Sequence, residues 1–100
     1  MGKGLKACEL CDREAPRACL TRHHCVPRGI QGTLIRGEIA RLCVSCHMMV
    51  HHVYTHKTLR AKYGTIASLR AAPELQEFMV WVRERPVTEV IRFTSWGPRF

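Results

Sequence analysis

Two Cys-x-x-Cys pairs constrain this chain more than any other feature: Cys8 with Cys11, and Cys43 with Cys46. A chain of 100 residues can bury only a modest core, and domains of this size commonly need a disulfide or a metal to be stable. Four thiolates from two such pairs form a closed tetrahedral set for zinc. The sequence therefore predicts one small domain that is stabilised by a structural Zn²⁺ bound to these four cysteines.

The six cysteines of the chain could instead indicate the disulfide bonds of a secreted protein. However, Met1 is followed by Gly-Lys-Gly-Leu-Lys, without the apolar core of a signal peptide, and no stretch reaches the roughly 18 apolar residues of a membrane span. We therefore expect a reducing, cytoplasmic setting without a membrane, where paired cysteines favour a metal. Cys19 and Cys25 lie outside the pairs, and we expect them to be small buried residues without chemistry.

Histidines form a second group of residues with metal-binding chemistry. His47 and His51 are four residues apart, so they share one face if residues 44–57, which contain neither Gly nor Pro, form a helix. Upstream lies the pair His23 and His24. Three imidazoles at positions 23, 47 and 51 would leave coordination positions open for water and substrate, an arrangement typical of hydrolases.

The two neighbouring histidines, His23 and His24, lie in a β-prone run, residues 18–26, which a proline ends. Neighbours on a regular strand point to opposite faces, so one of the pair would bind the metal and the other would serve a different role, unless a bend or bulge redirects them. His52 and His56 extend the histidine group. We expect His52 on the surface or facing DNA, and His56 too far along the helix to bind the metal.

Residues 8–56 resemble the HNH endonucleases of the ββα-metal fold, in the zinc-stabilised subgroup with two Cys-x-x-Cys pairs. The order of features is the same as in that family: a His-His pair, a loop over residues 27–37, a second strand over 39–43 and a helix from about residue 44. The resemblance implies an α+β fold, with a small ββα-metal (His-Me finger) core around a structural zinc. It also implies cleavage of DNA.

The resemblance further implies a role for each histidine of the site. His23, His47 and His51 would bind one catalytic divalent metal, and His24 would be the general base. Imidazole ligands suit Mn²⁺, Ni²⁺, Co²⁺ and Zn²⁺, whereas Mg²⁺ prefers oxygen and is the less natural choice. The family's middle residue is an asparagine, and this chain contains none. Glu38 lies about where the asparagine is expected, and its carboxylate either orients His24 or is a plain loop residue.

The C-terminal part of the sequence predicts helices that support the core. Gly64 followed by Thr65 indicates a helix stop and a new N-cap, which predicts short helices over residues 58–63 and 65–71. Pro73 suits the first turn of a helix over 74–85. Its apolar stripe is expected to pack against the core or a second copy of the chain: Leu75, Phe78, Met79 and Val82. We expect a single domain, with the HNH core over 8–57, a helical extension over 58–86 and a tail over 87–100.

The formal net charge of +8 favours binding to polyanions. Many of the cations lie near the proposed site in the sequence: Arg22, Arg28, Arg36, Arg41, Lys57, Arg60 and Lys62. We therefore expect a metal-dependent endonuclease that hydrolyses DNA phosphodiester bonds, as a homodimer or within a larger phage or restriction assembly. The alternative is a non-catalytic zinc module that binds nucleic acid, which the missing asparagine favours. A metal sensor or store would explain the Cys and His content but neither its order nor the charge.

Overall fold

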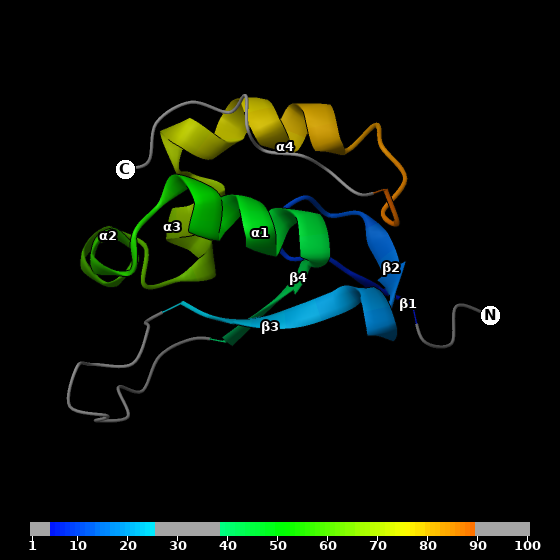
Figure 1. Ribbon diagram of the computed structural model, residues 1–100, viewed down its shortest axis with the longest axis horizontal. Coiled ribbons are helices and arrows are strands. Elements are labelled where there is room, and N and C mark those ends of the chain that lie inside the picture. Colours follow the sequence, from blue (N-terminus) through cyan, green and yellow to red (C-terminus); the bar gives the residue numbers. More distant parts are fainter. Residues whose placement is uncertain (1–4, 26–38, 90–100) are drawn as a thin grey trace.

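The computed structural model describes residues 5–25 and 39–89, and over these residues the fold is α+β (Figure 1). This part of the chain contains two two-stranded antiparallel sheets and four α-helices. The strands are β1 (Leu5–Ala7), β2 (Glu14–Pro16), β3 (Leu20–His24) and β4 (Ile39–Cys43). The helices are α1 (Val44–Val53), α2 (His56–Lys62), α3 (Ile66–Arg70) and α4 (Gln76–Val82), with 3-10 turns η1 (Arg17–Cys19) and η2 (Pro73–Leu75). None of the described helices is long and apolar enough to cross a bilayer.

The sheet of β3 and β4 has one buried face and one exposed face. Thr21 lies opposite Leu42, and His23 opposite Ala40; of these four residues three are fully buried and Thr21 is half-buried. Among the alternate positions, Arg22 and His24 of β3 are exposed, and so are Ile39 and Arg41 of β4. Figure 1 shows α1 between this sheet and α4. The buried face of the sheet therefore forms one wall of the core.

Helix α1 begins at Val44, as the sequence predicts, but it ends at Val53 and not at residue 57. Tyr54 adopts an extended conformation (φ −115°, ψ 137°), and the Thr55 side chain then accepts a hydrogen bond from the Thr58 N–H as the N-cap of α2. The Tyr54 ring is buried, and its hydroxyl donates to Glu74 at 2.6 Å. Burial of this ring and a strong N-cap residue together explain the break, which periodicity alone does not reveal.

The C-terminal helices pack onto α1. Thr65 is an N-cap as predicted, and it forms a capping box with Ser68 at the start of α3. The helix predicted over residues 74–85 is shorter at both ends, since a 3-10 turn occupies Pro73–Leu75 and α4 then runs only from Gln76 to Val82. The predicted apolar stripe is buried in the same core cluster as the inner face of α1: Leu75, Phe78, Met79 and Val82. The stripe therefore packs within this chain.

Candidate metal centres

Four cysteines come together where the two sheets meet α1. Their sulfur atoms all lie within 4.8 Å of one another, and all four residues are buried: Cys8, Cys11, Cys43 and Cys46. The first pair lies on the turn between β1 and β2, whereas the second spans the end of β4 and the first turn of α1. This cluster can hold a structural metal such as zinc, because thiolates in a tetrahedral set are its preferred closed site.

The turn that carries the first cysteine pair closes by local hydrogen bonds. The Cys11 N–H donates to Cys8 Sγ at 3.5 Å, and the Asp12 N–H donates to the Cys8 carbonyl at 2.9 Å. Asp12 has a φ of 70°, in the left-handed region that Asp and Asn tolerate better than most residues. This conformation reverses the chain directly after Cys11, so that Cys8 and Cys11 both face the second pair.

Arg13 supplies positive charge to the cysteine cluster. Its guanidinium donates to Cys11 Sγ and to Cys43 Sγ, both at 3.2 Å. Hydrogen bonds from Cys43 first, then from Cys46 and Cys8, hold the pKa of Cys11 far below its usual range. Hydrogen bonds from Cys11 first, then from Cys43 and Cys8, raise the pKa of Cys46. Thiols this close share protons, and a divalent cation between them lets all four ionise. The donor set therefore fits zinc.

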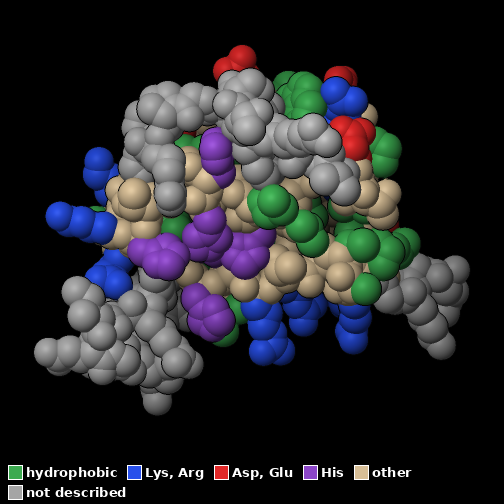
Figure 2. Space-filling model, in the orientation of Figure 1, with side chains coloured by type: hydrophobic (Ala, Val, Ile, Leu, Met, Phe, Trp, Pro, Cys, Tyr) green, Lys and Arg blue, Asp and Glu red, His purple; other side chains and the backbone are tan. Residues whose placement is uncertain are grey.

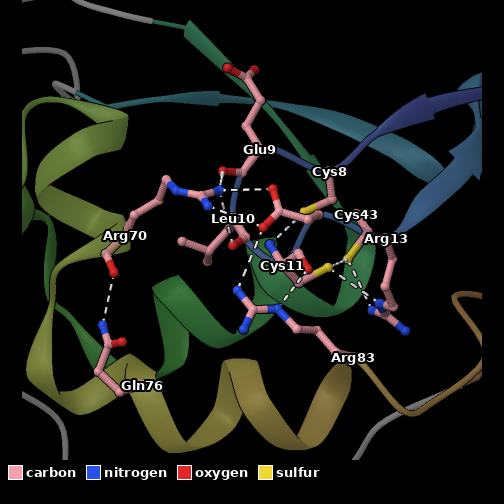
Figure 3. A network of polar contacts seen from close by, with 10 residues as sticks. Cys8, Glu9, Leu10, Cys11, Arg13, Cys43, Arg70, Gln76 and Arg83 are labelled. Carbon is pink, nitrogen blue, oxygen red and sulfur yellow. Dashed lines mark hydrogen bonds and ion pairs between the residues drawn. The ribbon is translucent and has the colours of Figure 1, made fainter.

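Two more arginines, from the C-terminal helices, hold the same turn from outside (Figure 3). Arg70 of α3 donates to both carboxylate oxygens of Asp12, at 3.0 and 3.1 Å, and to the Glu9 carbonyl at 2.7 Å. Arg83, just after α4, donates to the Cys11 carbonyl at 3.0 Å and lies 3.6 Å from Asp12. The helical extension therefore supports the backbone of the first cysteine pair directly.

Three histidines form a second cluster, between β3 and α1. The ring nitrogens of His23, His47 and His51 approach within 4.8 Å of one another, so they can hold one metal ion. The ring centroids are separated by 5.2 Å for His23 and His47, and by 4.9 Å for His47 and His51. His23 is buried, whereas His47 and His51 are half-buried. Strand pairing and the four-residue helical spacing thus bring together imidazoles that are distant in the sequence.

The environment of His23 fits a metal ligand. The side chain is fully buried, and neither of its ring nitrogens has a hydrogen-bond partner among the described residues. Burial first, and then the positive charges of the neighbouring histidines, lower its pKa to about 4, so the ring is neutral at pH 7. A buried polar atom without a partner costs about 1–3 kcal/mol, and coordination to a metal removes this cost. The three nitrogens therefore match a divalent ion that accepts imidazole.

A hydrogen-bond chain fixes the orientation of His47. The Thr21 hydroxyl donates its single proton to the Leu42 carbonyl at 2.9 Å, and the same oxygen lies 2.7 Å from His47 Nδ1. Because that proton is already donated, Thr21 Oγ1 accepts from His47 Nδ1–H, and the Nε2 of the neutral ring is left with a free lone pair. Metal-binding histidines commonly donate their second N–H in this way. Burial, and then the charge of His24, also lowers the pKa of His47.

The histidine cluster opens to the surface on one side. A groove of about 250 Å³ is lined by Thr21, Val44, His47, Met48 and His51. Figure 2 shows histidine side chains gathered on this face of the molecule, over α1 and β3. Two of the three candidate ligands thus border an open groove, in contrast to the buried cysteines.

His24 lies at the end of β3, on the face opposite to His23. It is exposed, yet close enough for its charge to lower the pKa of both His23 and His47. The strand geometry thus separates the two neighbours, as the sequence predicts. Glu38, the residue expected to orient His24, lies outside the described residues, and so does the whole predicted loop over residues 27–37; the described chain resumes at Ile39, which pairs with His24.

Two sequence expectations about other residues need correction, those for His56 and Cys19. His56 is not far from the site: because α1 ends early, the chain turns and the His56 ring lies 5.4 Å from that of His51. His52 is half-buried, so part of its side chain reaches the surface, as expected. Cys25 is fully buried as expected, but Cys19 lies in η1 and is half-buried.

The sequence analysis also missed residues that support both clusters. Thr21 orients His47, and Arg13 contacts two thiols, although neither stands out by type or spacing. Asp12 with Arg70 and Arg83 joins the first cysteine turn to the distant helices. Of these residues only Asp12 could have been found from a local pattern. It directly follows the first Cys-x-x-Cys pair, at a backbone position in the left-handed region, where Gly, Asn and Asp are favoured.

Comparison with known proteins places the chain in a family. It is 38% identical to a protein from Bacillus subtilis (strain 168) over 85 residues, which make up 85% of this chain and 81% of the relative. That relative is described as "Uncharacterized protein YisB". The chain belongs to the same family as YisB. No family model and no solved structure matches the chain.

Proposed function

We propose that this protein is a metal-dependent endonuclease of the HNH type, with β3, β4 and α1 as its ββα-metal core. The observation that supports this most strongly is the convergence of His23, His47 and His51 beside an open groove, with the exposed His24 close by. A structural metal site is normally closed by four protein ligands, whereas a catalytic site keeps a coordination position open. In this proposal the four cysteines hold a structural zinc, and the histidines hold the catalytic metal.

In the proposed reaction His24 is the general base. Its exposed imidazole would take a proton from the water that attacks phosphorus. As the new P–O bond forms, the bond from phosphorus to the 3′ oxygen breaks, and this oxygen takes a proton from solvent water, which leaves 5′-phosphate and 3′-hydroxyl ends. A divalent ion on His23, His47 and His51 would stabilise the negative charge that develops on the phosphate.

The other residues of the site would hold this arrangement in place. Thr21 keeps the His47 ring with Nε2 towards its neighbours, because Nδ1–H is donated to the hydroxyl. Neutral nitrogen ligands favour Mn²⁺, Ni²⁺, Co²⁺ or Zn²⁺ over Mg²⁺. DNA is the proposed substrate, since a chain of formal charge +8 attracts polyanions. An orienting role for Glu38 remains part of the proposal.

Cleavage of a supercoiled plasmid tests the proposal. The purified, zinc-loaded protein is incubated with plasmid alone, and then with Mn²⁺, Ni²⁺, Co²⁺, Zn²⁺ or Mg²⁺. We expect nicked or linear product with at least one added ion, and none from a His24→Ala variant that still binds that ion. Binding of the plasmid without cleavage under any ion would contradict the nuclease and favour the non-catalytic zinc module.

A further inference from the structure

A second cleft lies on the other side of β3 from the core. Its volume is about 230 Å³, and four of the six residues that line it are cations: Lys6, Arg17, Arg22 and Arg41, with Leu20 and Thr21. The cations come from β1, η1, β3 and β4, so the fold and not the local sequence brings them together. No acidic side chain is among these lining residues.

The arrangement of these cations carries an electrostatic cost. Arg22 and Arg41 are directly opposite each other in the antiparallel pair, where like charges are destabilising. Within residues 5–25 and 39–89, none of the four cationic side chains forms an ion pair. The Glu9 carboxylate accepts instead from the Arg41 backbone N–H. An anionic ligand in the cleft would offset the repulsion.

The cleft adjoins the histidine groove. Thr21 lines both spaces, so the two meet at β3. Figure 2 shows Lys and Arg side chains along the lower edge of the molecule, below β3, whereas Asp and Glu side chains lie at the upper edge. A long anion that reaches the histidines therefore also meets this cationic surface.

We propose that the cleft of Lys6, Arg17, Arg22 and Arg41 binds a phosphate group of a nucleic-acid backbone and so anchors the strand beside the histidine groove. Arginine suits this role because its planar fork donates two parallel hydrogen bonds to phosphate oxygens. The choice of nucleic acid as the source of the phosphate rests on the proposed function. None of the residues that line the cleft is itself a proposed metal ligand or the proposed base.

Binding of a fluorescein-labelled DNA duplex, followed by fluorescence anisotropy without added divalent metal, tests the anchor. The double variant Arg22→Ala/Arg41→Ala should bind at least 10-fold more weakly than the parent at moderate salt. The slope of log K against log salt should also fall by roughly 0.9 for each phosphate that the variant no longer neutralises. The matched control is Lys57→Ala/Lys62→Ala, which removes the same charge from exposed positions on α2 and should reduce affinity less.

One further variant and one further ligand distinguish the possible explanations of this result. A variant with Lys at both positions keeps the charge but lacks the fork, and it should bind with intermediate affinity. Inorganic phosphate, titrated by calorimetry, should bind the parent more weakly than the duplex does. Equal reductions in the cleft and control variants would overturn the proposal, and so would tight binding of free phosphate with unchanged duplex affinity. The assay needs no cleavage, so a protein that cuts no plasmid yet binds the duplex through Arg22 and Arg41 would contradict the nuclease and leave the anchor standing.

Discussion

The cysteine and histidine clusters share helix α1 but differ in access. All four cysteines are buried, and arginines from the β1–β2 turn and from the C-terminal helices surround them. Only His23 of the histidine cluster is fully buried, and its partners border a groove. Helix α1 contributes to both, through Cys46 in its first turn and through His47 and His51 further along. One helix thus serves a closed site and an open one.

The comparison shows how neighbouring residues acquire different chemistry. Cys46 points into the junction of the two sheets, whereas His47, the next residue, points towards β3 and the groove, because successive helical residues are rotated by about 100°. A closed thiolate site contributes to folding energy, and an open imidazole site can exchange water and substrate. Substitutions in the two clusters should therefore have separable effects.

The largest effect is expected from Cys43→Ser. Removing one thiolate from a buried four-cysteine site should release about one equivalent of zinc and abolish cooperative folding, because apparent zinc-binding energies in small domains reach about 10–16 kcal/mol. Metal analysis and thermal melting by circular dichroism measure the two changes. Cys19→Ser, outside the cluster, is the control and should keep its zinc. A Cys43→Ser protein with unchanged zinc content and melting temperature would show that the four cysteines do not hold a structural zinc.

A smaller but still large effect is expected from His47→Ala. It should weaken Ni²⁺ or Mn²⁺ binding by more than the roughly 10 to 100-fold that removal of a supporting partner costs, while the zinc of the cysteine site and the fold persist. His24→Ala should bind the ion as the parent does and lose most cleavage. Calorimetric titration distinguishes the two variants. If His24→Ala loses the ion and His23→Ala keeps it, the roles of the two neighbours are exchanged.

Thr21→Val should have an intermediate effect. The change keeps the shape of the side chain but removes the oxygen that accepts from His47 Nδ1–H, so the ring is no longer held in one orientation. Affinity for the added ion, or activity, should fall by roughly 10 to 100-fold. Thr21→Ser restores the hydroxyl and should recover most of this affinity. Equal affinities in parent and Thr21→Val would show that the hydroxyl does not position the ligand.

The smallest effect is expected from Arg70→Ala. Its bond to Asp12 is exposed, and surface ion pairs contribute about 1 kcal/mol or less. Because the variant also lacks the bond to the Glu9 carbonyl, we expect a destabilisation of about 1 kcal/mol, which corresponds to roughly 4–8 °C in melting temperature. Lys62→Ala, exposed at the end of α2, is the control. A fall in zinc content at saturating metal would show that the Arg70 side chain is needed for metal binding by the four cysteines.

The sequence indicated the ligand types and several element boundaries because these depend on local patterns. Helix α1 starts at Val44, Thr65 is an N-cap and the stripe from Leu75 to Val82 is buried, as predicted. The end of α1 was wrong, since burial of Tyr54 and capping by Thr55 override an unbroken helical run. The prediction for His56 was wrong for the same reason: a helix continued to residue 57 would hold His56 away from the site, whereas in the structure its ring lies near that of His51.

By itself the sequence determined which atoms are available: two spaced thiol pairs, two imidazoles one helical turn apart and a histidine pair on a strand. Only the tertiary structure decided what surrounds them. The register of β3 against β4 turned His23 inward and His24 outward, and it placed Arg22 opposite Arg41. The packing of α3 and α4 brought Arg70 and Arg83 to the Cys8–Asp12 turn. Ligand type is a property of single residues, whereas burial, proton sharing and charge repulsion arise from distances between residues that are remote in the chain.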